Sequence, residues 1–141
     1  MKQCKPAIKA VIIKDEKFLI LHQQHTADYS TWGLPGGKVE YQEHPHDTLK
    51  REVKEETNLE IEIIKPLGMY TFTMTRQPNH YIVITVFLCR PLTDVIDTIC
   101  NNVTDEKIID CKWVSKKEFL KIKNIDDESL RELIQGIDSW D

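Results

Sequence analysis

The feature that most limits the fold is a helix-forming segment, residues 45–58, set between runs of strand-forming residues. Pro45 suits the first turn of a helix, and no further proline or glycine occurs before Asn58. Asn58 is suited to end the helix, because asparagine follows glycine in preference for the left-handed cap conformation. A helix between β-rich halves predicts an α/β domain rather than an all-helical or all-strand one.

The segments around this helix carry the patterns of strands and loops. Residues 6–15 and 17–24 are apolar runs separated by polar residues, which predicts a hairpin. Three later segments predict further strands: "LEIEII" (59–64), "YIVITVFLC" (81–89) and "IIDCKWVS" (108–115). The segment "HTADYSTWGLPGG", residues 25–37, is rich in turn formers and predicts a long loop.

Two more helices are expected near the C-terminus. Ser115 and Glu118 have the spacing of a capping box, which predicts a short helix after the last strand. An amphipathic helix is indicated by Leu130, Leu133, Ile134 and Ile137. We therefore expect residues 1–141 to form a single domain of the α/β (α+β) class, with helices on the faces of a mixed sheet.

Composition excludes several classes of protein. With 40% hydrophobic and 30% charged residues, the 141-residue chain fits a soluble globular protein. We expect a cytoplasmic protein without a membrane segment, because the N-terminus lacks a signal-peptide pattern and no apolar run reaches spanning length. The net charge of -4 and the scattered basic residues argue against binding of long nucleic acids. The four cysteines form no C-x-x-C pair, which argues against a zinc or dithiol site. The oligomeric state is left open, with a homodimer as one arrangement.

Three carboxylates gather on one side of the predicted helix. Glu52, Glu55 and Glu56 fall within roughly a third of the circumference, since successive residues are about 100° apart. Each like-charge pair at this spacing costs about 0.2–0.5 kcal/mol. This repulsion predicts that Glu55→Gln or Glu56→Gln raises the melting temperature of the metal-free protein.

The surroundings of the acidic stripe favour a cation. A charge run of this kind is usually a solvated face. Here, however, the paired glycines of "GLPGG" lie upstream and allow the backbone to approach a ligand closely. Carboxylates together with carbonyl oxygens are the ligands of hard divalent cations. The stripe therefore indicates a site for Mg²⁺ or Mn²⁺.

The spacing of these residues matches a known signature. From Gly37 the pattern is glycine, five residues, Glu43, seven residues, and then "REVKEETNL" (51–59). This closely resembles the Nudix box, Gly-x5-Glu-x7-Arg-Glu-U-x-Glu-Glu-x-Gly-U with U aliphatic, at eight of nine specified positions. The departure is Asn58 in place of glycine, which the left-handed cap tolerates at modest cost. The resemblance implies a Nudix-like α/β/α sandwich.

The resemblance also implies roles for the acidic residues. Glu52 and Glu56 would be the principal metal ligands, with the carbonyl of Gly36 contributing. Glu55 would be either a further ligand or the group that activates water. A second acid outside the box is often used in this family, from a loop before the last strand. Glu106 and Asp110 lie in that region. Both also fit ordinary surface acids, and Glu106 is slightly favoured of the two.

Arg51 and Glu43 resemble the supporting pair of the family. Their ion pair would hold the loop against the helix and orient the glutamates. The alternative is a surface ion pair that contributes little. The box positions favour the supporting role, because Mg²⁺ requires ligands held within a small tolerance of octahedral geometry.

The implied activity is hydrolysis of a pyrophosphate linkage in a nucleoside diphosphate derivative. The short "TWGLPGG" and "NHYIVITVF" segments look most like small MutT-like nucleoside triphosphate pyrophosphohydrolases, which release a nucleoside monophosphate and pyrophosphate. ADP-ribose and dinucleoside polyphosphates are alternative substrates. Candidate substrate-binding residues are Trp32 as a base platform, Gly37 through its backbone, and Arg76 and His80 toward phosphates. Trp32 could equally be a core anchor.

Two readings from other classes stay open. One keeps the fold but drops catalysis, giving a nucleotide-sensing Nudix domain. The other makes the acidic helix a protein-interaction face on an ordinary α/β module, for which Mg²⁺ would change neither ligand binding nor thermal stability. The presence of all the box acids favours catalysis over both.

Overall fold

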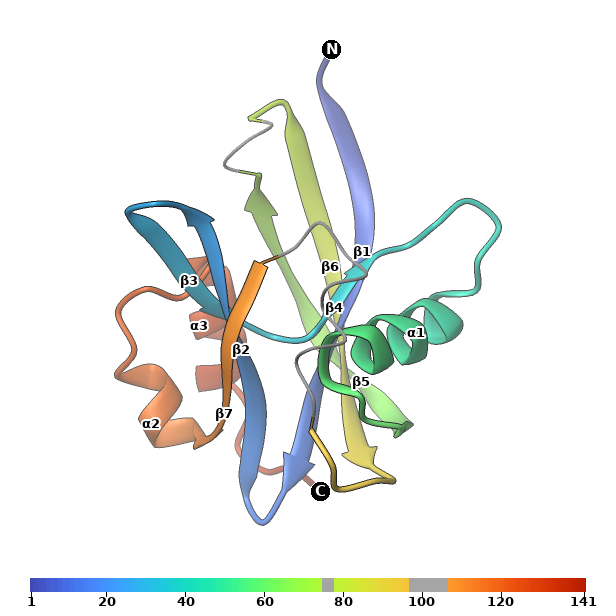
Figure 1. Ribbon diagram of the computed structural model, residues 1–141, viewed down its shortest axis with the longest axis vertical. Coiled ribbons are helices and arrows are strands. Elements are labelled where there is room, and N and C mark those ends of the chain that lie inside the picture. Colours follow the sequence, from blue (N-terminus) through green and yellow to red (C-terminus); the bar gives the residue numbers. More distant parts are fainter. Residues whose placement is uncertain (75–77, 97–106) are drawn as a thin grey trace.

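The computed structural model describes residues 1–74, 78–96 and 107–141. The strands and helices (Figure 1) follow one another along the chain in the order β1 (Gln3–Lys14), β2 (Lys17–Thr26), β3 (Tyr29–Gly33), β4 (Gly36–Lys38), α1 (Pro45–Thr57), β5 (Ile61–Thr73), β6 (His80–Pro91), β7 (Lys107–Ser115), α2 (Lys116–Leu120) and α3 (Glu128–Gln135).

The strands form a mixed sheet. Its main path runs β3-β2-β1-β6-β5, with β4 paired to β1 and β7 paired to β2. Strands β1 and β6 are parallel, whereas the other pairings are antiparallel. The predicted hairpin is confirmed by the β1–β2 pairing, in which Ile13 faces Phe18. The parallel pair requires a long crossover, and the segment between β1 and β6 that contains α1 supplies it.

The apolar core has two parts, one on each face of the sheet. On one face, Leu49 and Val53 of α1 are fully buried against residues of β1 and β6 such as Ile8 and Cys89. On the other face, Phe119 of α2 and residues of α3 pack on the opposite sides of the same strands. Figure 1 shows α1 separated by the sheet from α2 and α3. The expected α/β/α sandwich is therefore confirmed.

The long loop predicted for residues 25–37 is wrong, because the segment contains β3 and β4. Residues 29–33 pair with β2, and Gly36–Lys38 pairs with β1 between Ala7 and Lys9. These pairings depend on partners that lie up to about 30 residues earlier in the chain, and the local richness in turn formers conceals them. The correction places the paired glycines in a strand next to α1.

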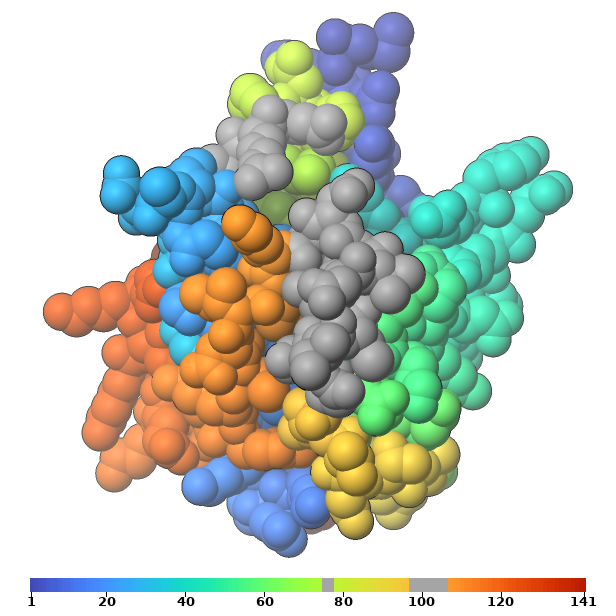
Figure 2. Space-filling model, viewed as in Figure 1, coloured from blue at the N-terminus to red at the C-terminus, as the bar shows by residue number. Residues whose placement is uncertain are grey.

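Helix α1 has the ends that the sequence predicts. Pro45 is its first residue, and the side chain of His44 accepts a hydrogen bond from the backbone N–H of His46. Asn58 is the C-cap at φ 67° and ψ 6°, and its N–H donates to the carbonyl of Lys54 at 2.9 Å. The loop that precedes α1 stands out from the body of the molecule (Figure 2), and Tyr41 in this loop is 92% exposed.

Glycine at position 58 is expected to stabilise the protein slightly. The left-handed conformation costs a non-glycine residue free energy, whereas glycine adopts it freely. Among the described residues, the Asn58 side chain has one hydrogen bond to lose, a long 3.5 Å contact with the carbonyl of Val95. Asn58→Gly should raise the free energy of unfolding by about 0.5–1 kcal/mol in urea titrations, with Asn58→Ala as the destabilised control. A loss of stability in Asn58→Gly would mean that the contact with Val95 matters more than the cap conformation.

The C-terminal helices also follow the sequence. The capping box at α2 is present, because Ser115 and Glu118 exchange side chain to backbone hydrogen bonds. In α3, Leu130 and Ile134 are fully buried. Ile137, which the amphipathic pattern included, lies beyond the last helical turn. In the described parts of the chain, no helix has the length and apolar character needed to span a membrane.

Candidate active site

The acidic side of α1 lies against β4. The backbone N–H of Gly36 donates to Oε1 of Glu56 at 2.8 Å, and Glu56 is only 2% exposed. The Glu52 carboxyl group packs on Gly37, because a β-carbon added to Gly37 would lie 2.5 Å from its Cδ. Two of the three stripe carboxylates are therefore held at the same two-residue segment of strand.

Gly36 allows this close approach. Its φ is +142°, and an added β-carbon would lie 2.2 Å from the carbonyl oxygen of Ile8 in β1. Both the conformation and the contact exclude any other residue. The contact that the structure describes from Gly36 to the stripe is through its amide, whereas the sequence led us to expect a role for its carbonyl.

Arg51 and Glu43 form a bidentate ion pair. Nε and Nη2 of Arg51 donate to Oε2 and Oε1 of Glu43 at 2.9 and 3.0 Å. The hydroxyl of Thr48 donates to the same Oε1 at 2.7 Å. The hydrogen bonds from Arg51 and then Thr48 lower the pKa of Glu43 to about 2, and the bond to Glu43 raises the pKa of Arg51 above its usual value. The pair joins the loop before α1 to the middle of the helix.

The remaining nitrogen of Arg51 reaches the acidic stripe. Nη1 lies 3.2 Å from Oε1 of Glu52 and 3.4 Å from both carboxylate oxygens of Glu55. Arg51 therefore supplies positive charge to two stripe carboxylates, and the Gly36 amide supplies a donor to the third. These contacts offset part of the repulsion between the three carboxylates that the sequence indicated.

The donor set has the chemistry of a divalent-cation site, but the side chains are not arranged as one. Oxygen ligands next to an approachable backbone are what Mg²⁺ and Mn²⁺ prefer. Within residues 1–74, 78–96 and 107–141, however, no three His, Cys, Asp or Glu side chains are grouped to hold a metal ion. Glu52 and Glu55 contact Arg51 instead, so cation binding requires these side chains to move relative to it.

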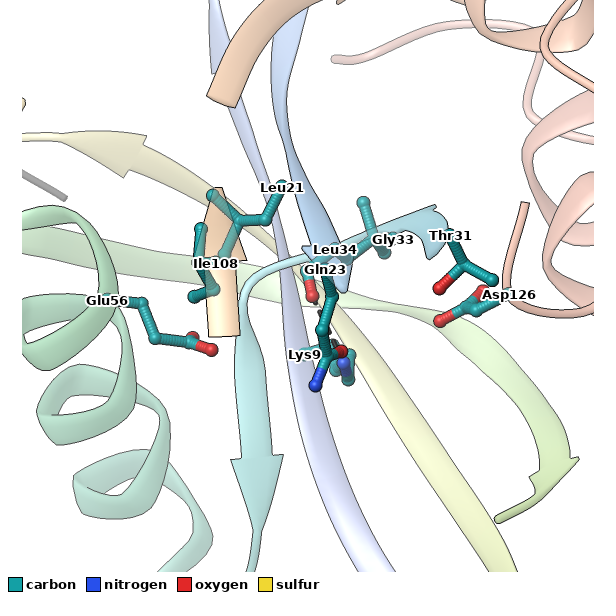
Figure 3. A pocket seen from close by; sticks show the side chains of 9 residues that line it. All are labelled: Lys9, Leu21, Gln23, Thr31, Gly33, Leu34, Glu56, Ile108 and Asp126. Carbon is teal, nitrogen blue, oxygen red and sulfur yellow. Dashed lines mark hydrogen bonds between the residues drawn. The ribbon is translucent and has the colours of Figure 1, made fainter. Parts of the chain in front are cut away.

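A small cavity extends from Glu56 to the loop before α3. Its volume is about 10 Å³, which is room for one water molecule. Figure 3 shows Glu56 at one side, Thr31 and Asp126 at the other, and Lys9 and Gln23 between them. Nζ of Lys9 donates to the carbonyl of Leu34 at 3.1 Å. The cavity is thus lined by polar groups of both charges and adjoins the acidic stripe.

Asp126 is the unusual member of this cavity. Burial raises its pKa to about 6, although Lys9 acts in the opposite direction. Its Oδ1 is buried. The carboxyl group interacts with the buried hydroxyl of Tyr70, which lowers the pKa of Asp126 and raises that of Tyr70. Burial, followed by the charge of Asp126, raises the pKa of Tyr70. An ionised Asp126 is therefore costly in the folded protein.

The proposed substrate-binding residues have varied surroundings. The Trp32 ring stacks on His22 with centroids 4.4 Å apart, and Nζ of Lys112 lies 4.5 Å from the ring centroid. The Trp32 ring is thus already in contact with side chains of the protein itself. His80 begins β6 beside Gln3, and burial, followed by the charges of Lys5 and Lys38, lowers its pKa. Arg76 and Glu106 lie outside the described residues.

Sequence reasoning missed three residues at this site. Thr48 occupies an unspecified position of the box, so spacing gave no reason to select it. Lys9 lies in an apolar run of residues, and nothing in the sequence pattern selects it. Asp126 precedes Asp127; in the structure Asp127 is the N-cap of α3, and Asp126 lines the cavity. Its partner segment, Gly33, lies 93 positions earlier in the chain, beyond any local signal.

An α/β/α sandwich with an acidic helix packed on a glycine pair is the arrangement that the box signature implied. The NUDIX domain family profile matches residues 5–134, so this chain belongs to the NUDIX domain family. Hydrolases of this family generally need divalent metal ions.

Comparison with individual proteins agrees with this assignment. A MutT-like protein of Streptomyces ambofaciens is 36% identical over 85 residues, which cover 60% of this chain and 51% of that protein. An ADP-ribose pyrophosphatase of Methanocaldococcus jannaschii is 33% identical over 82 residues, which cover 58% of this chain and 48% of that protein. The matched regions span about half the length of these relatives.

Solved structures share the fold. The MutT NUDIX hydrolase from Burkholderia pseudomallei superposes with a TM-score of 0.78 at 19% identity, over 96% of this chain and 99% of that one. The MutT protein from Methanosarcina mazei Go1 also gives 0.78, at 23% identity, over 95% and 92% of the two chains. Similarity at this level of identity establishes the fold alone.

Proposed function

We propose that this chain is a divalent-metal-dependent pyrophosphohydrolase of nucleoside diphosphate derivatives. The first candidate reaction converts a nucleoside triphosphate to the monophosphate and pyrophosphate. The observation that carries the proposal is the position of Glu52 and Glu56 against the Gly36–Gly37 backbone, with Glu55 beside them on α1. Residues 1–141 would act as one domain on a soluble small molecule.

The proposed roles are those that the resemblance to the family implies. Glu52, Glu56 and the carbonyl of Gly36 would hold Mg²⁺ or Mn²⁺, and Glu55 would be a further ligand or would take the proton of the attacking water. Bound cations would neutralise phosphate charge and orient the water. Arg51, anchored by Glu43, would keep the glutamates in register and offset their charge.

Other proposed contacts to the substrate depend on less of the structure. Gly37 offers backbone groups at the site, and His80 and Trp32 remain candidates for phosphate and base contacts. Arg76 and the distal acid Glu106 remain predictions from the sequence. A homodimer and a cytoplasmic location are likewise retained as proposals.

ADP-ribose is the second candidate substrate. One relative with 33% identity over 82 residues is named an ADP-ribose pyrophosphatase, which is a specific reason to include it. Both candidates contain the same phosphoanhydride linkage, so the same metal and glutamates would serve either reaction. They differ in the group beyond the phosphates.

A substrate panel tests the proposal. The purified protein is incubated with nucleoside triphosphates, oxidised nucleotides, ADP-ribose and diadenosine polyphosphates, with Mg²⁺, with Mn²⁺ and with EDTA. We expect metal-dependent release of pyrophosphate or of two monophosphates from one class. If every compound is bound but none is hydrolysed with either metal, the nucleotide-sensing alternative is favoured. If neither metal nor nucleotide changes the melting temperature, the interaction-face alternative is favoured.

Alanine at position 37 is expected to weaken metal binding without unfolding the protein. An added β-carbon would lie 2.5 Å from Cδ of Glu52, so the flexible carboxylate must move away. Mn²⁺ affinity, measured by calorimetry, should fall by about 10-fold to 100-fold, as for loss of other ligand-orienting contacts. Gly136→Ala is the matched control, because its added β-carbon makes only ordinary contacts of 3.5 and 3.6 Å. Unchanged affinity in Gly37→Ala would argue against Glu52 as a ligand.

A further inference from the structure

Thr48 is a fully buried threonine in the second turn of α1, next to the ion pair of Glu43 and Arg51. Its hydroxyl donates to Oε1 of Glu43 at 2.7 Å. The carbonyl of His44, one turn earlier, is 3.3 Å from the same hydroxyl. Since a hydroxyl has one proton to donate, the shorter contact makes Glu43 its main partner.

A second threonine on the same helix shows what the ordinary arrangement looks like. Thr57 is also fully buried, and its hydroxyl donates to the carbonyl of Val53, four residues earlier, at 2.7 Å. That bond is the usual one for a threonine within a helix. Thr48 has turned the same kind of hydroxyl toward a carboxylate instead.

The contact of Thr48 completes the set of donors around Glu43. Arg51 donates to both carboxylate oxygens, and Thr48, one helical turn earlier on α1, adds a third hydrogen bond. With Nε and Nη2 of Arg51 fixed in this way, Nη1 is the nitrogen left to contact Glu52 and Glu55. A continuous series of contacts therefore runs from the Thr48 hydroxyl to two stripe carboxylates.

We propose that Thr48 is a positioning residue for the metal-binding glutamates, acting through Glu43 and Arg51. The inference rests on the proposed function for its consequence in catalysis, but the positioning itself is a property of the metal-free protein. Loss of the hydroxyl lets the Glu43 carboxylate rotate, and Arg51 then no longer presents Nη1 to Glu52 and Glu55 in one fixed orientation. The free energy of cation binding then includes the cost of ordering these groups.

The test compares three variants of the full chain. Thr48→Val removes the hydroxyl and keeps the branched shape, Thr48→Ser keeps the hydroxyl, and Thr57→Val makes the same change at an equally buried site on the same helix. Mn²⁺ affinity is measured by calorimetry without nucleotide. We expect about 10-fold weaker binding in Thr48→Val, and affinity within about twofold of the original protein in Thr48→Ser and Thr57→Val.

A metal-independent readout separates this inference from the proposed function. The Arg51 Nε–H signal in nitrogen–proton NMR spectra of the metal-free protein reports the Glu43 contact directly. It should broaden or exchange faster with solvent in Thr48→Val and stay unchanged in Thr57→Val. If the original protein bound no Mn²⁺ and hydrolysed no nucleotide, the proposed function would fail while this signal still decided the positioning role.

The result that overturns the inference is equally specific. If Thr48→Val and Thr57→Val have the same Arg51 signal and the same Mn²⁺ affinity as the original protein, Thr48 contributes packing alone. Agreement of both readouts with the expected losses, with recovery in Thr48→Ser, supports the positioning role. In a Glu43→Gln background the Thr48→Val change should add less than about twofold in affinity, because the partner it positions has been altered.

Discussion

Replacement of Glu56 by glutamine is expected to lower nucleotide turnover at least about 100-fold while leaving the metal-free melting temperature almost unchanged. Loss of contacts that merely orient a ligand costs about 10-fold to 100-fold, and a ligand itself should cost at least the upper value. Glutamine keeps a side-chain oxygen that can accept the hydrogen bond from the Gly36 amide. The change therefore removes the charge that a cation needs and keeps the local structure.

The measurements are initial rates with the best substrate of the panel and thermal unfolding in EDTA. Glu62→Gln serves as the matched control, because Glu62 is an exposed glutamate paired with Arg90 on the neighbouring strand. Turnover by Glu56→Gln within a few-fold of the original rate would remove Glu56 from the ligand set. A large fall in melting temperature would show that its ionised form is needed for folding.

This expectation revises the prediction that neutralising a stripe glutamate raises the metal-free melting temperature. That prediction assumed uncompensated repulsion between the three carboxylates. In the structure Glu55 lies 3.4 Å from Nη1 of Arg51, and Glu56 accepts from the Gly36 amide. These contacts already offset much of the repulsion, and glutamine at position 56 still accepts the hydrogen bond from the Gly36 amide. We therefore now expect only a small change in melting temperature.

Asp126→Asn is expected to stabilise the protein near neutral pH and to have little effect near pH 4. Burial raises the pKa of Asp126 to about 6, above its value in the unfolded chain, which is near 3.8. Between these values the folded protein holds a proton that the unfolded chain has released, so the contribution of Asp126 to stability decreases as pH rises from about 4 to 6. Two pKa units correspond to roughly 2–3 kcal/mol.

The test is the difference in unfolding free energy between Asp126→Asn and the original protein, measured in urea from pH 4 to pH 8. The difference should grow in favour of the variant by roughly 2–3 kcal/mol across this range and then level off above about pH 7. Taking the difference between variant and original protein cancels the contributions of other titrating groups. One of these is Glu43: its lowered pKa stabilises the protein above about pH 4, and this stabilisation is lost as pH falls toward 2. The exposed Asp138→Asn is the control. If the difference in unfolding free energy does not depend on pH, folding does not raise the pKa of Asp126.

The parts of the fold that the sequence predicts well are those with local causes. The ends of α1 depend on Pro45 and Asn58, and the start of α2 depends on a capping box within four residues. The first hairpin depends on two adjacent apolar runs. In each case the residues that determine the structure are neighbours in the chain, so their preferences can be read directly.

The parts that escaped prediction have distant causes. Strands β3 and β4 exist because β2 and β1 offer them partners, and no pattern within residues 25–37 reveals this. At the site, the box spacing selected the glutamates and the Arg51–Glu43 pair because family resemblance carries their positions. The carboxyl of Asp126 lies beside Gly33, 93 positions earlier in the chain, only after folding. Thr48 is the exception, because it is five positions from Glu43 but occupies an unspecified position of the box.

The tight contact of β4 with β1 and α1 means that two parts of the site, the glycine pair and the cavity lining, differ in how well they tolerate substitution. At Gly36 and Gly37 the glutamates meet main chain rather than side chains, so no exchange of neighbouring residues can compensate for a bulkier one there. Gln23 and Thr31, in contrast, line the cavity with side chains carried on other strands. The glycine pair is therefore expected to tolerate fewer substitutions than the lining of the small cavity.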